Sequence, residues 1–290
     1  MNENRHIDRT QDRRQFLQRT SVGAVASLVG LPALGIGIAN ENNGSAKKVK
    51  FKLGMASYTL RRFNLDQTLS MSQRLALKYI CLKDVHLPLN ADTEQIRDTV
   101  AKVNEAGLNL YAGGVIYMSN PMLVRQAFAY AQAAGMKIIV GVPNHDLLPL
   151  VEEMVRDTDI KVAIHNHGPG DPLYPTPQSV YERIEALDER IGLCLDVGHT
   201  MRSGIDPSEP VRQYAHRLLD VHIKDVSAAT ARGSTMEIGR GLIDIPEFLQ
   251  TLIDIEYTGI VSFEHEKDER DPLPGVAESV GYVRGVLSVR

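Results

Sequence analysis

The chain has 290 residues, of which 43% are hydrophobic and 23% charged, so it can bury a substantial core. Its formal net charge of -4 at pH 7 gives no general electrostatic reason to expect nucleic acid or a membrane surface as a partner. The two cysteines, Cys81 and Cys194, lie in apolar runs that we place far apart in the fold. We therefore expect buried free thiols rather than a disulfide.

The beginning of the chain, residues 1–39, differs in kind from the rest. Arg13 and Arg14 are followed by an apolar stretch, residues 21–39, that is rich in small residues and uncharged. This order predicts an export signal, and the paired arginines resemble those of twin-arginine signals. We expect a polar linker over residues 40–48, a periplasmic mature protein, and no stable membrane association once the signal is removed. An uncleaved membrane anchor is the alternative.

From residue 49 onward, short apolar runs alternate with segments of helical spacing. The predicted strands cover residues 49–57, 79–87, 109–117, 137–142, 161–165, 191–196, 219–224 and 259–264. The predicted helices cover residues 65–78, 93–106, 121–134, 145–156, 178–189, 208–217, 245–255 and 274–287. Gly107 and Gly135 follow two of these helices, as expected of helix C-terminal stops. Eight such units predict one (β/α)8 TIM barrel over residues 49–290, and an open doubly wound sheet is the weaker alternative because no Gly-x-Gly-x-x-Gly follows the first strand.

Charged and imidazole side chains gather at the ends of the predicted strands, where the active sites of such barrels lie. Side chains alternate along a strand, so one imidazole or carboxylate from each of strands five to eight should point into the barrel. These are His165, Asp196, His222 and Glu264. Mixed nitrogen and oxygen ligands suit Mn²⁺, Co²⁺, Zn²⁺ or Fe²⁺, and burying these groups without a cation would be costly. We predict one divalent ion here, with structural hydrogen bonding as the alternative for any single residue.

Four ordered motifs carry a resemblance to a known family. They are Leu-Cys-Leu-Asp196-Val-Gly-His199, Asp-Val-His222-Ile-Lys224-Asp225, Gly239-Arg240-Gly241, and Tyr257-Thr-Gly-Ile-Val-Ser-Phe-Glu264. With them the chain resembles the xylose isomerase-like TIM barrel superfamily, most of all its sugar phosphate isomerase/epimerase group. The resemblance implies one divalent ion bound by Glu, Asp, His and Glu from strands five to eight, and two glutamates that move a proton next to a sugar carbonyl. It makes Asp196, His222 and Glu264 metal ligands, His199 a substrate contact, and Arg240 part of the loop over the sugar.

The resemblance stops at strand five, where His165 stands in place of the family's glutamate. A coordinated imidazole is a poor general base, so the two-carboxylate relay is not intact. Subgroups with a similar His-x-His strand include inosose dehydratase-like enzymes, and some exported relatives are thought to act on 3-keto sugars or keto-glycosides. We predict catalytic roles for Glu264, His165, His199 and Lys224, and substrate contacts for Lys83, His86, His167 and Arg240.

Together these patterns predict a metal-dependent sugar or keto-sugar isomerase or epimerase that moves a proton next to a carbonyl. Two alternatives stay open: a metal-dependent lyase or dehydratase on 3-keto sugars or keto-glycosides, and a non-catalytic periplasmic sugar-binding barrel. A DNA repair endonuclease of the same fold would need a three-metal cluster and a basic groove, which the acidic charge balance disfavours. The expected partner is a small sugar, and a homo-oligomer is left open.

Overall fold

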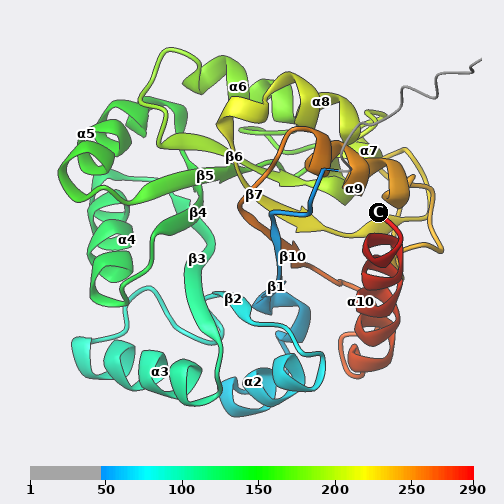
Figure 1. Ribbon diagram of the computed structural model, residues 1–290. Helices are drawn as coiled ribbons and strands as arrows, with labels where there is room; N and C mark the ends of the chain where they lie inside the picture. The colour runs from blue at the N-terminus through cyan, green and yellow to red at the C-terminus, as the bar shows by residue number, and fades with distance from the viewer. Residues whose placement is uncertain (1–46) are drawn as a thin grey trace, which may run out of the picture. The chain divides into compact units, whose positions relative to one another are not determined.

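A closed barrel of eight parallel strands forms the centre of the molecule in the computed structural model, which describes residues 47–290. The strands are hydrogen-bonded in the order β1-β10-β7-β6-β5-β4-β3-β2, and the helices surround them (Figure 1). This architecture confirms the predicted (β/α)8 TIM barrel. The export signal predicted for residues 1–39 lies outside the described residues.

The barrel strands are short and mostly buried. Their bounds are β1 Lys52–Ala56, β2 Tyr79–Leu82, β3 Asn109–Met118, β4 Ile138–Pro143, β5 Lys161–His165, β6 Ile191–Asp196, β7 Leu218–Ile223 and β10 Ile260–Phe263. A separate two-stranded antiparallel sheet, β8 Asp225–Val226 and β9 Thr235–Met236, follows β7 and was not predicted. Because of this insertion, the eighth strand of the barrel carries the label β10.

The helices begin and end where local chemistry favours it. They are α2 Leu65–Arg74, α3 Thr93–Glu105, α4 Pro121–Ala133, α5 Leu148–Thr158, α6 Pro177–Ile184, α7 Val197–Arg202, α8 Ser208–Gln213, α9 Ile245–Asp254 and α10 Leu273–Ser288. Capping boxes start α2 at Asn64 and α3 at Asp92. Gly107 and Gly135 follow α3 and α4 with φ of 67° and 68°, which confirms them as helix stops.

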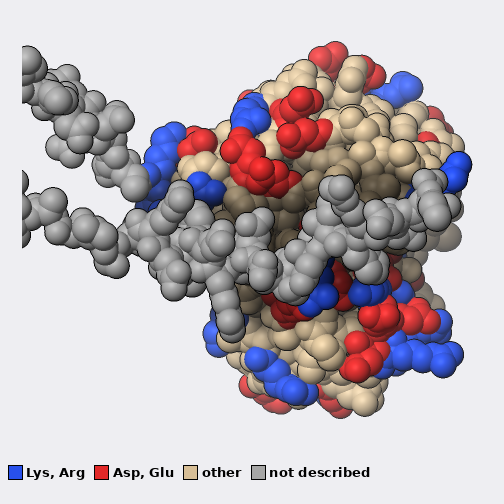
Figure 2. Space-filling model, turned by 90° about the vertical axis from the view of Figure 1, so that its right-hand side faces the viewer, with Lys and Arg blue, Asp and Glu red and all other residues tan. Residues whose placement is uncertain are grey.

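Two apolar layers stabilise the barrel. The larger lies between strands and helices, and a smaller one fills the barrel interior with Cys81, Tyr111, Cys194, Ile260 and small side chains. Both cysteines are buried and unpaired, which confirms the prediction of free thiols. Among residues 47–290, no helix combines the length and apolar character needed to cross a bilayer. On the face seen in Figure 2, acidic and basic side chains are intermixed rather than gathered by sign.

Several predicted element bounds were wrong for physical reasons. The second strand ends at Leu82 instead of residue 87, because the chain turns there and leaves Val85 half exposed. The helix predicted over residues 178–189 ends at Ile184. The backbone carbonyls just after Ile184 accept hydrogen bonds from the buried Arg217 guanidinium instead of from a further helical turn. The helix α7 was missed altogether. Its six residues are too few to show a helical period.

Candidate metal centre

Four of the predicted site residues meet at the C-terminal ends of neighbouring barrel strands, β5, β6, β7 and β10 (Figure 1). His165, Asp196, His222 and Glu264 are all buried, and one ligand atom from each lies within 4.8 Å of the others. His165 Nε2 is 3.3 Å from Asp196 Oδ2, and His222 Nδ1 is 3.3 Å from Glu264 Oε2. Two imidazoles and two carboxylates thus form one closed cluster, which we call the four-residue cluster.

The unpaired atoms of the four-residue cluster fit a divalent cation. Neither ring nitrogen of His165 or His222 has a hydrogen-bond partner among residues 47–290, although both rings are buried. Buried polar atoms without partners are costly unless something else binds them. Imidazole and carboxylate donors suit Mn²⁺, Co²⁺, Zn²⁺ or Fe²⁺. Cys194 also lies near both imidazoles, and burial raises the pKa of its thiol, which disfavours the thiolate form.

A lysine ammonium belongs to the same buried region. Lys224 Nζ lies 2.9 Å from Asp196 Oδ2 and 2.8 Å from Glu264 Oε2, and it also contacts Glu266. Burial would lower the pKa of Lys224, but the nearby carboxylates outweigh burial and hold that pKa well above its usual value. Burial would likewise raise the pKa of Asp196 and of Glu264, but Lys224 together with the nearby imidazoles outweighs burial, so the pKa of each carboxyl is lowered. Gly198 makes room for this lysine, because a Cβ there would collide with the Lys224 side chain.

The sequence after β6 fixes the orientation of Asp196. Asp196 is the N-cap of α7, and its Oδ1 accepts a hydrogen bond from the His199 backbone N–H at 2.7 Å. Its other oxygen, Oδ2, therefore faces the cluster. Asn166 Oδ1 accepts a hydrogen bond from the Asp196 backbone N–H at 3.0 Å, and Asn166 Nδ2 donates to Thr200. The Asp-Val-Gly-His spacing thus lets one carboxylate cap α7 with one oxygen and face the four-residue cluster with the other.

A pocket of about 240 Å³ adjoins the four-residue cluster. The residues that line it are Tyr58, Lys83, Val115, Tyr117, His165, His167, His199, Glu264 and Glu266. His165 and Glu264 face both the cluster and the pocket, so a molecule bound in the pocket would touch the metal position. The volume lies below the range of roughly 300–1,000 Å³ for drug-sized ligands, which fits one small polar molecule.

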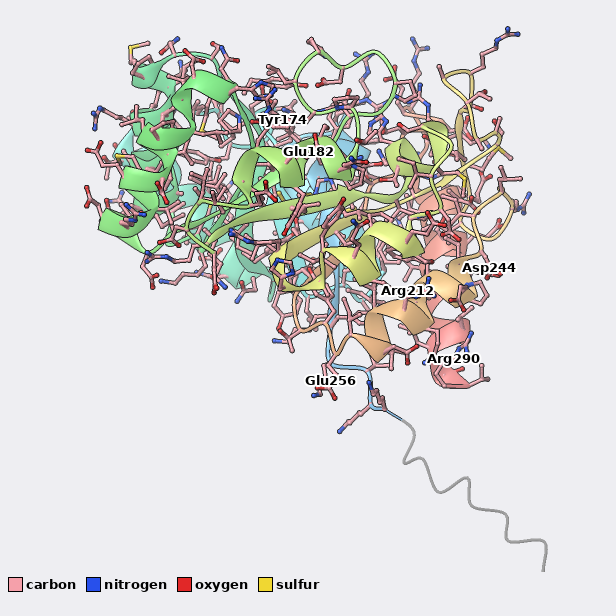
Figure 3. All side chains as sticks on the ribbon, turned by 90° about the horizontal axis from the view of Figure 1, so that it is seen from above. Tyr174, Glu182, Arg212, Asp244, Glu256 and Arg290 are labelled. Atoms are coloured by element: carbon pink, nitrogen blue, oxygen red, sulfur yellow. The ribbon has the colours of Figure 1, made fainter. Side chains whose placement is uncertain are left out.

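Two further imidazoles line the pocket. His167 Nε2 lies 3.2 Å from the Tyr117 hydroxyl, and the two rings stack with centroids 5.6 Å apart. The loop that carries His167 is held by the fully buried Tyr174 (Figure 3), whose backbone carbonyl accepts a hydrogen bond from the His167 N–H. Burial lowers the pKa of His165 to about 3 and also lowers those of His167 and His199. These imidazoles are neutral near pH 7, and His167 and His199, which lie outside the four-residue cluster, can accept a proton.

Lys83 supplies a positive charge to the pocket wall. Its Nζ donates a hydrogen bond to the Val115 carbonyl at 2.6 Å and lies 3.6 Å from the Asp84 carboxylate. Lys224, in contrast, is not among the residues that line the pocket. It lies behind Glu264 and Glu266, so any effect it has on a bound molecule acts through these carboxylates.

Two residues predicted to contact substrate lie away from this pocket. His86 is buried, with Nδ1 2.8 Å from Ser57 Oγ and Nε2 2.9 Å from Thr68 Oγ1. These two contacts link the segment just after β1 to α2. Arg240 is exposed and pairs with Glu278 of α10, where both line a separate surface hollow. His86 was predicted from its place after a strand and Arg240 from the family resemblance, and neither signal fixes the direction of a side chain.

The loop that carries Arg240 is organised by one buried carboxylate. Asp225 is fully buried, and its two oxygens accept hydrogen bonds from the backbone N–H groups of Val226, Gly239, Gly241 and Ile243. The distances lie between 2.8 and 3.1 Å. Gly241 is needed because a Cβ there would collide with this carboxylate. Asp225 therefore shapes the loop rather than contacting the pocket.

Replacing Asp225 with alanine is expected to lower the free energy of unfolding by about 3–5 kcal/mol, because two buried and two partly buried N–H groups lose their acceptor. Chemical denaturation measures this change. Asp244 (labelled in Figure 3) is a matched control, because this exposed residue in the same loop accepts one backbone hydrogen bond, at the start of α9. Asp244→Ala should cost only about 1 kcal/mol. Equal losses for the two variants would contradict the role given to Asp225.

Sequence reasoning gave no role to several residues that shape the pocket. Glu266 has the same strand parity as Glu264, which is a signal that could have found it. Tyr117 ends the third predicted strand, but an aromatic residue there is equally typical of packing. Asn166 and Tyr58 gave no usable signal, because their roles depend on contacts that form only in the folded barrel.

A family comparison covers more than half of the chain. Residues 123–286 match the sequence profile of the family described as xylose isomerase-like TIM barrel. This range contains β4 to β10 and all of the four-residue cluster.

Curated relatives match about half of the chain. An inosose dehydratase of Geobacillus kaustophilus is 27% identical over 155 residues, which is 48% of this chain and 48% of that protein. The rhizopine catabolism protein MocC of Rhizobium meliloti is 28% identical over 151 residues, which is 47% of this chain and 46% of that protein. The chain thus spans about half the length of the curated relatives it matches.

Solved structures match most of the barrel. The IolI protein with a bound zinc atom has a TM-score of 0.69 at 18% identity, covering 82% of this chain and 99% of that one. An L-ribulose 3-epimerase has a TM-score of 0.68 at 16% identity, covering 82% and 95%. A 3-keto-D-glucoside 4-epimerase from E. coli has a TM-score of 0.66 at 15% identity, covering 81% and 100%. At these identities the likeness establishes the fold.

Proposed function

The chain belongs to the xylose isomerase-like TIM barrel family, and from this premise we propose that it is a divalent-metal-dependent enzyme that isomerises or epimerises a sugar or keto-sugar. The reaction moves a proton at the carbon next to a carbonyl. The observation that carries the proposal is the buried four-residue cluster, which opens onto a small polar pocket. The names of structural neighbours, which include two sugar epimerases, support it.

The pocket favours an unphosphorylated sugar of the size of a single ring. Among the residues that line it, Lys83 is the only lysine or arginine. Phosphate groups are usually bound by several cationic side chains or by a helix N-terminus. Tyr58 and Tyr117 add aromatic surface for the apolar face of a sugar ring. The volume of about 240 Å³ limits the part that reaches the cluster to one small unit.

The residues near the pocket would have different roles in this reaction. His165, Asp196, His222 and Glu264 would hold the ion, which polarises a carbonyl and so stabilises negative charge on the adjacent carbon. The neutral imidazole of His199 faces the pocket and can accept the proton. Lys83 lies where its ammonium can donate a hydrogen bond to a substrate oxygen. In this scheme Lys224 keeps the carboxylate of Glu264 ionised.

A dehydratase is the second candidate, and a specific observation favours it. His165 occupies the strand-five position where the resemblance implies a glutamate, and the curated relatives include inosose dehydratases. An elimination needs the proton to leave but does not need it to return to the same carbon. The hydroxyl that leaves takes up the proton and departs as water, so one group near the cluster that first accepts and then donates the proton is enough for that reaction.

The proposed place of action is the periplasm. The support is the order of paired arginines, an apolar stretch and a polar spacer within residues 1–48. Expression of the full chain in a strain lacking twin-arginine export would test this location by cell fractionation.

Hydrogen exchange on keto-sugars tests the proposed reaction. The full chain is stripped with a chelator, reloaded with Mn²⁺ and incubated in D₂O with L-ribulose, D-tagatose, methyl 3-keto-β-D-glucoside and scyllo-inosose. We expect the proton signal next to the carbonyl of at least one compound to disappear in the NMR spectrum, and to persist when the chelator is left in place. A deuterated epimer indicates epimerisation, and loss of water indicates dehydration.

Two results would contradict an enzyme of this kind. If the chain retains no divalent ion after dialysis and exchanges none of these protons, the metal-dependent reaction is wrong. If calorimetry shows a sugar bound at the ion-loaded pocket without exchange, the chain is a sugar-binding barrel.

A further inference from the structure

A further buried carboxylate lies deeper in the barrel than the four-residue cluster. Asp220 is fully buried in β7, two residues before His222 on the same face of the strand. Its oxygens accept hydrogen bonds from the Tyr111 hydroxyl of β3 at 3.1 and 3.2 Å. The same hydroxyl lies 2.8 Å from Ser262 Oγ of β10. The Cys194 thiol of β6 also donates to Asp220 Oδ2, at 3.7 Å. Tyr111 and Cys194 thus hold this carboxylate directly, whereas Ser262 contacts only the Tyr111 hydroxyl.

Within the four-residue cluster, the His222 ring lies between Asp220 and Glu264. Its Nδ1 faces Glu264 Oε2 at 3.3 Å, and its Nε2 faces Asp220 Oδ2 at 3.6 Å. The two nitrogens of one imidazole therefore face two different carboxylates. Within the described residues neither nitrogen has a hydrogen bond, so the geometry leaves Nδ1 for a metal and Nε2 for Asp220.

We propose that Asp220 is the positioning residue of the metal centre, which orients the His222 ring and keeps its proton on Nε2 so that the Nδ1 lone pair faces the ion. This inference rests on the proposed metal-dependent function. Histidines that bind metals usually donate their other N–H to a carboxylate or a carbonyl, and loss of that partner typically costs 10- to 100-fold in metal affinity. Tyr111 acts one step further away by holding Asp220.

A purely structural role for Asp220 makes a different prediction. A residue that only fills the barrel interior would, on substitution, lower stability equally with and without the ion. A positioning residue lowers the affinity for the ion itself and changes the geometry of the ligands. The test therefore uses two readouts besides activity: the affinity for Zn²⁺ and the electronic absorption spectrum with Co²⁺.

The experiment compares the full chain with Asp220→Asn, Tyr111→Phe and Ser262→Ala. Each protein is stripped of metal and titrated with Zn²⁺ in competition with a chromogenic chelator, and its melting temperature is measured with excess chelator. We expect Asp220→Asn to bind Zn²⁺ about 10- to 100-fold more weakly and to shift the Co²⁺ absorption bands. Tyr111→Phe should weaken binding several-fold. Ser262→Ala is the matched control, because Ser262 contacts Tyr111 but not Asp220. This variant should bind Zn²⁺ as tightly as the unaltered chain does.

The outcomes separate this inference from the proposed function. If Asp220→Asn folds and binds Zn²⁺ with unchanged affinity and spectrum, the positioning role is wrong while the metal centre stands. If Asp220→Asn does not fold, Tyr111→Phe decides, because it keeps the ring and removes only the hydroxyl that holds the carboxylate. Unchanged Zn²⁺ affinity in that variant would overturn the proposal. If the unaltered chain itself binds no Zn²⁺, the proposed metal-dependent function fails first.

Discussion

Replacing Asp196 with alanine is expected to remove tight binding of a divalent ion. Its Oδ2 is one of the ligand atoms that converge within 4.8 Å, so the loss in Zn²⁺ affinity should exceed the roughly 100-fold that outer contacts typically contribute. Chelator competition measures the affinity. Because Asp196 also caps α7, alanine should in addition lower the free energy of unfolding by about 1 kcal/mol.

Two further variants separate the ligand from the helix cap. Asp196→Asn keeps a side-chain oxygen for the His199 N–H but removes the charge, so it should lose the ion with little loss of helix capping. Asp92→Ala removes a comparable cap from α3, far along the chain from the cluster, and should leave Zn²⁺ affinity unchanged. Tight binding of Zn²⁺ by both Asp196 variants would contradict the proposed centre.

Replacing Lys224 with methionine is expected to lower the free energy of unfolding of the chelator-treated protein by about 3–5 kcal/mol, because two buried carboxylates lose their compensating charge. A bound divalent ion would supply positive charge to the same carboxylates. Saturating Zn²⁺ should therefore raise the melting temperature of Lys224→Met by more than it raises that of the unaltered chain. Thermal denaturation with and without the ion measures both effects.

Lys267→Met provides the matched control for this result. Lys267 pairs with Glu237 and Asp268 but is partly exposed, and ion pairs of that kind are typically worth less than about 1 kcal/mol. Lys267→Met should therefore have nearly the same free energy of unfolding as the unaltered chain. Zn²⁺ should raise the melting temperature of the two proteins by similar amounts. If Zn²⁺ stabilises Lys224→Met no more than the unaltered chain, Lys224 and the ion do not share the carboxylates.

The sequence predicted the barrel and the four-residue cluster because both follow from strand periodicity. The bounds of β5 and β6 agree with the predicted ranges, and alternation along the strands placed His165 and Asp196 on the inner side. The short helix after Asp196 was not predictable from any period. It depends on one side-chain cap and on the room that Gly198 leaves for Lys224.

The roles of residues in the loops after the strands were harder to predict from the sequence, for physical reasons. His86 was predicted from its place after a strand and Arg240 from the family resemblance, but their partners, Ser57 and Glu278, come from distant parts of the chain. Asp225 illustrates the same limit, because its four backbone donors are brought together only by the folded loop. No spacing rule predicts such long-range contacts.

The strand order places the four-residue cluster and part of the pocket wall on different sides of the barrel. All four residues of the cluster come from β5, β6, β7 and β10, which are neighbours, whereas Tyr58, Lys83, Val115 and Tyr117 come from the chain at β1, β2 and β3. The wall residues can therefore be substituted while the four residues of the cluster stay unchanged. Under the proposed function, changes of substrate preference are to be sought among these wall residues, whose substitution leaves all four residues of the cluster in place.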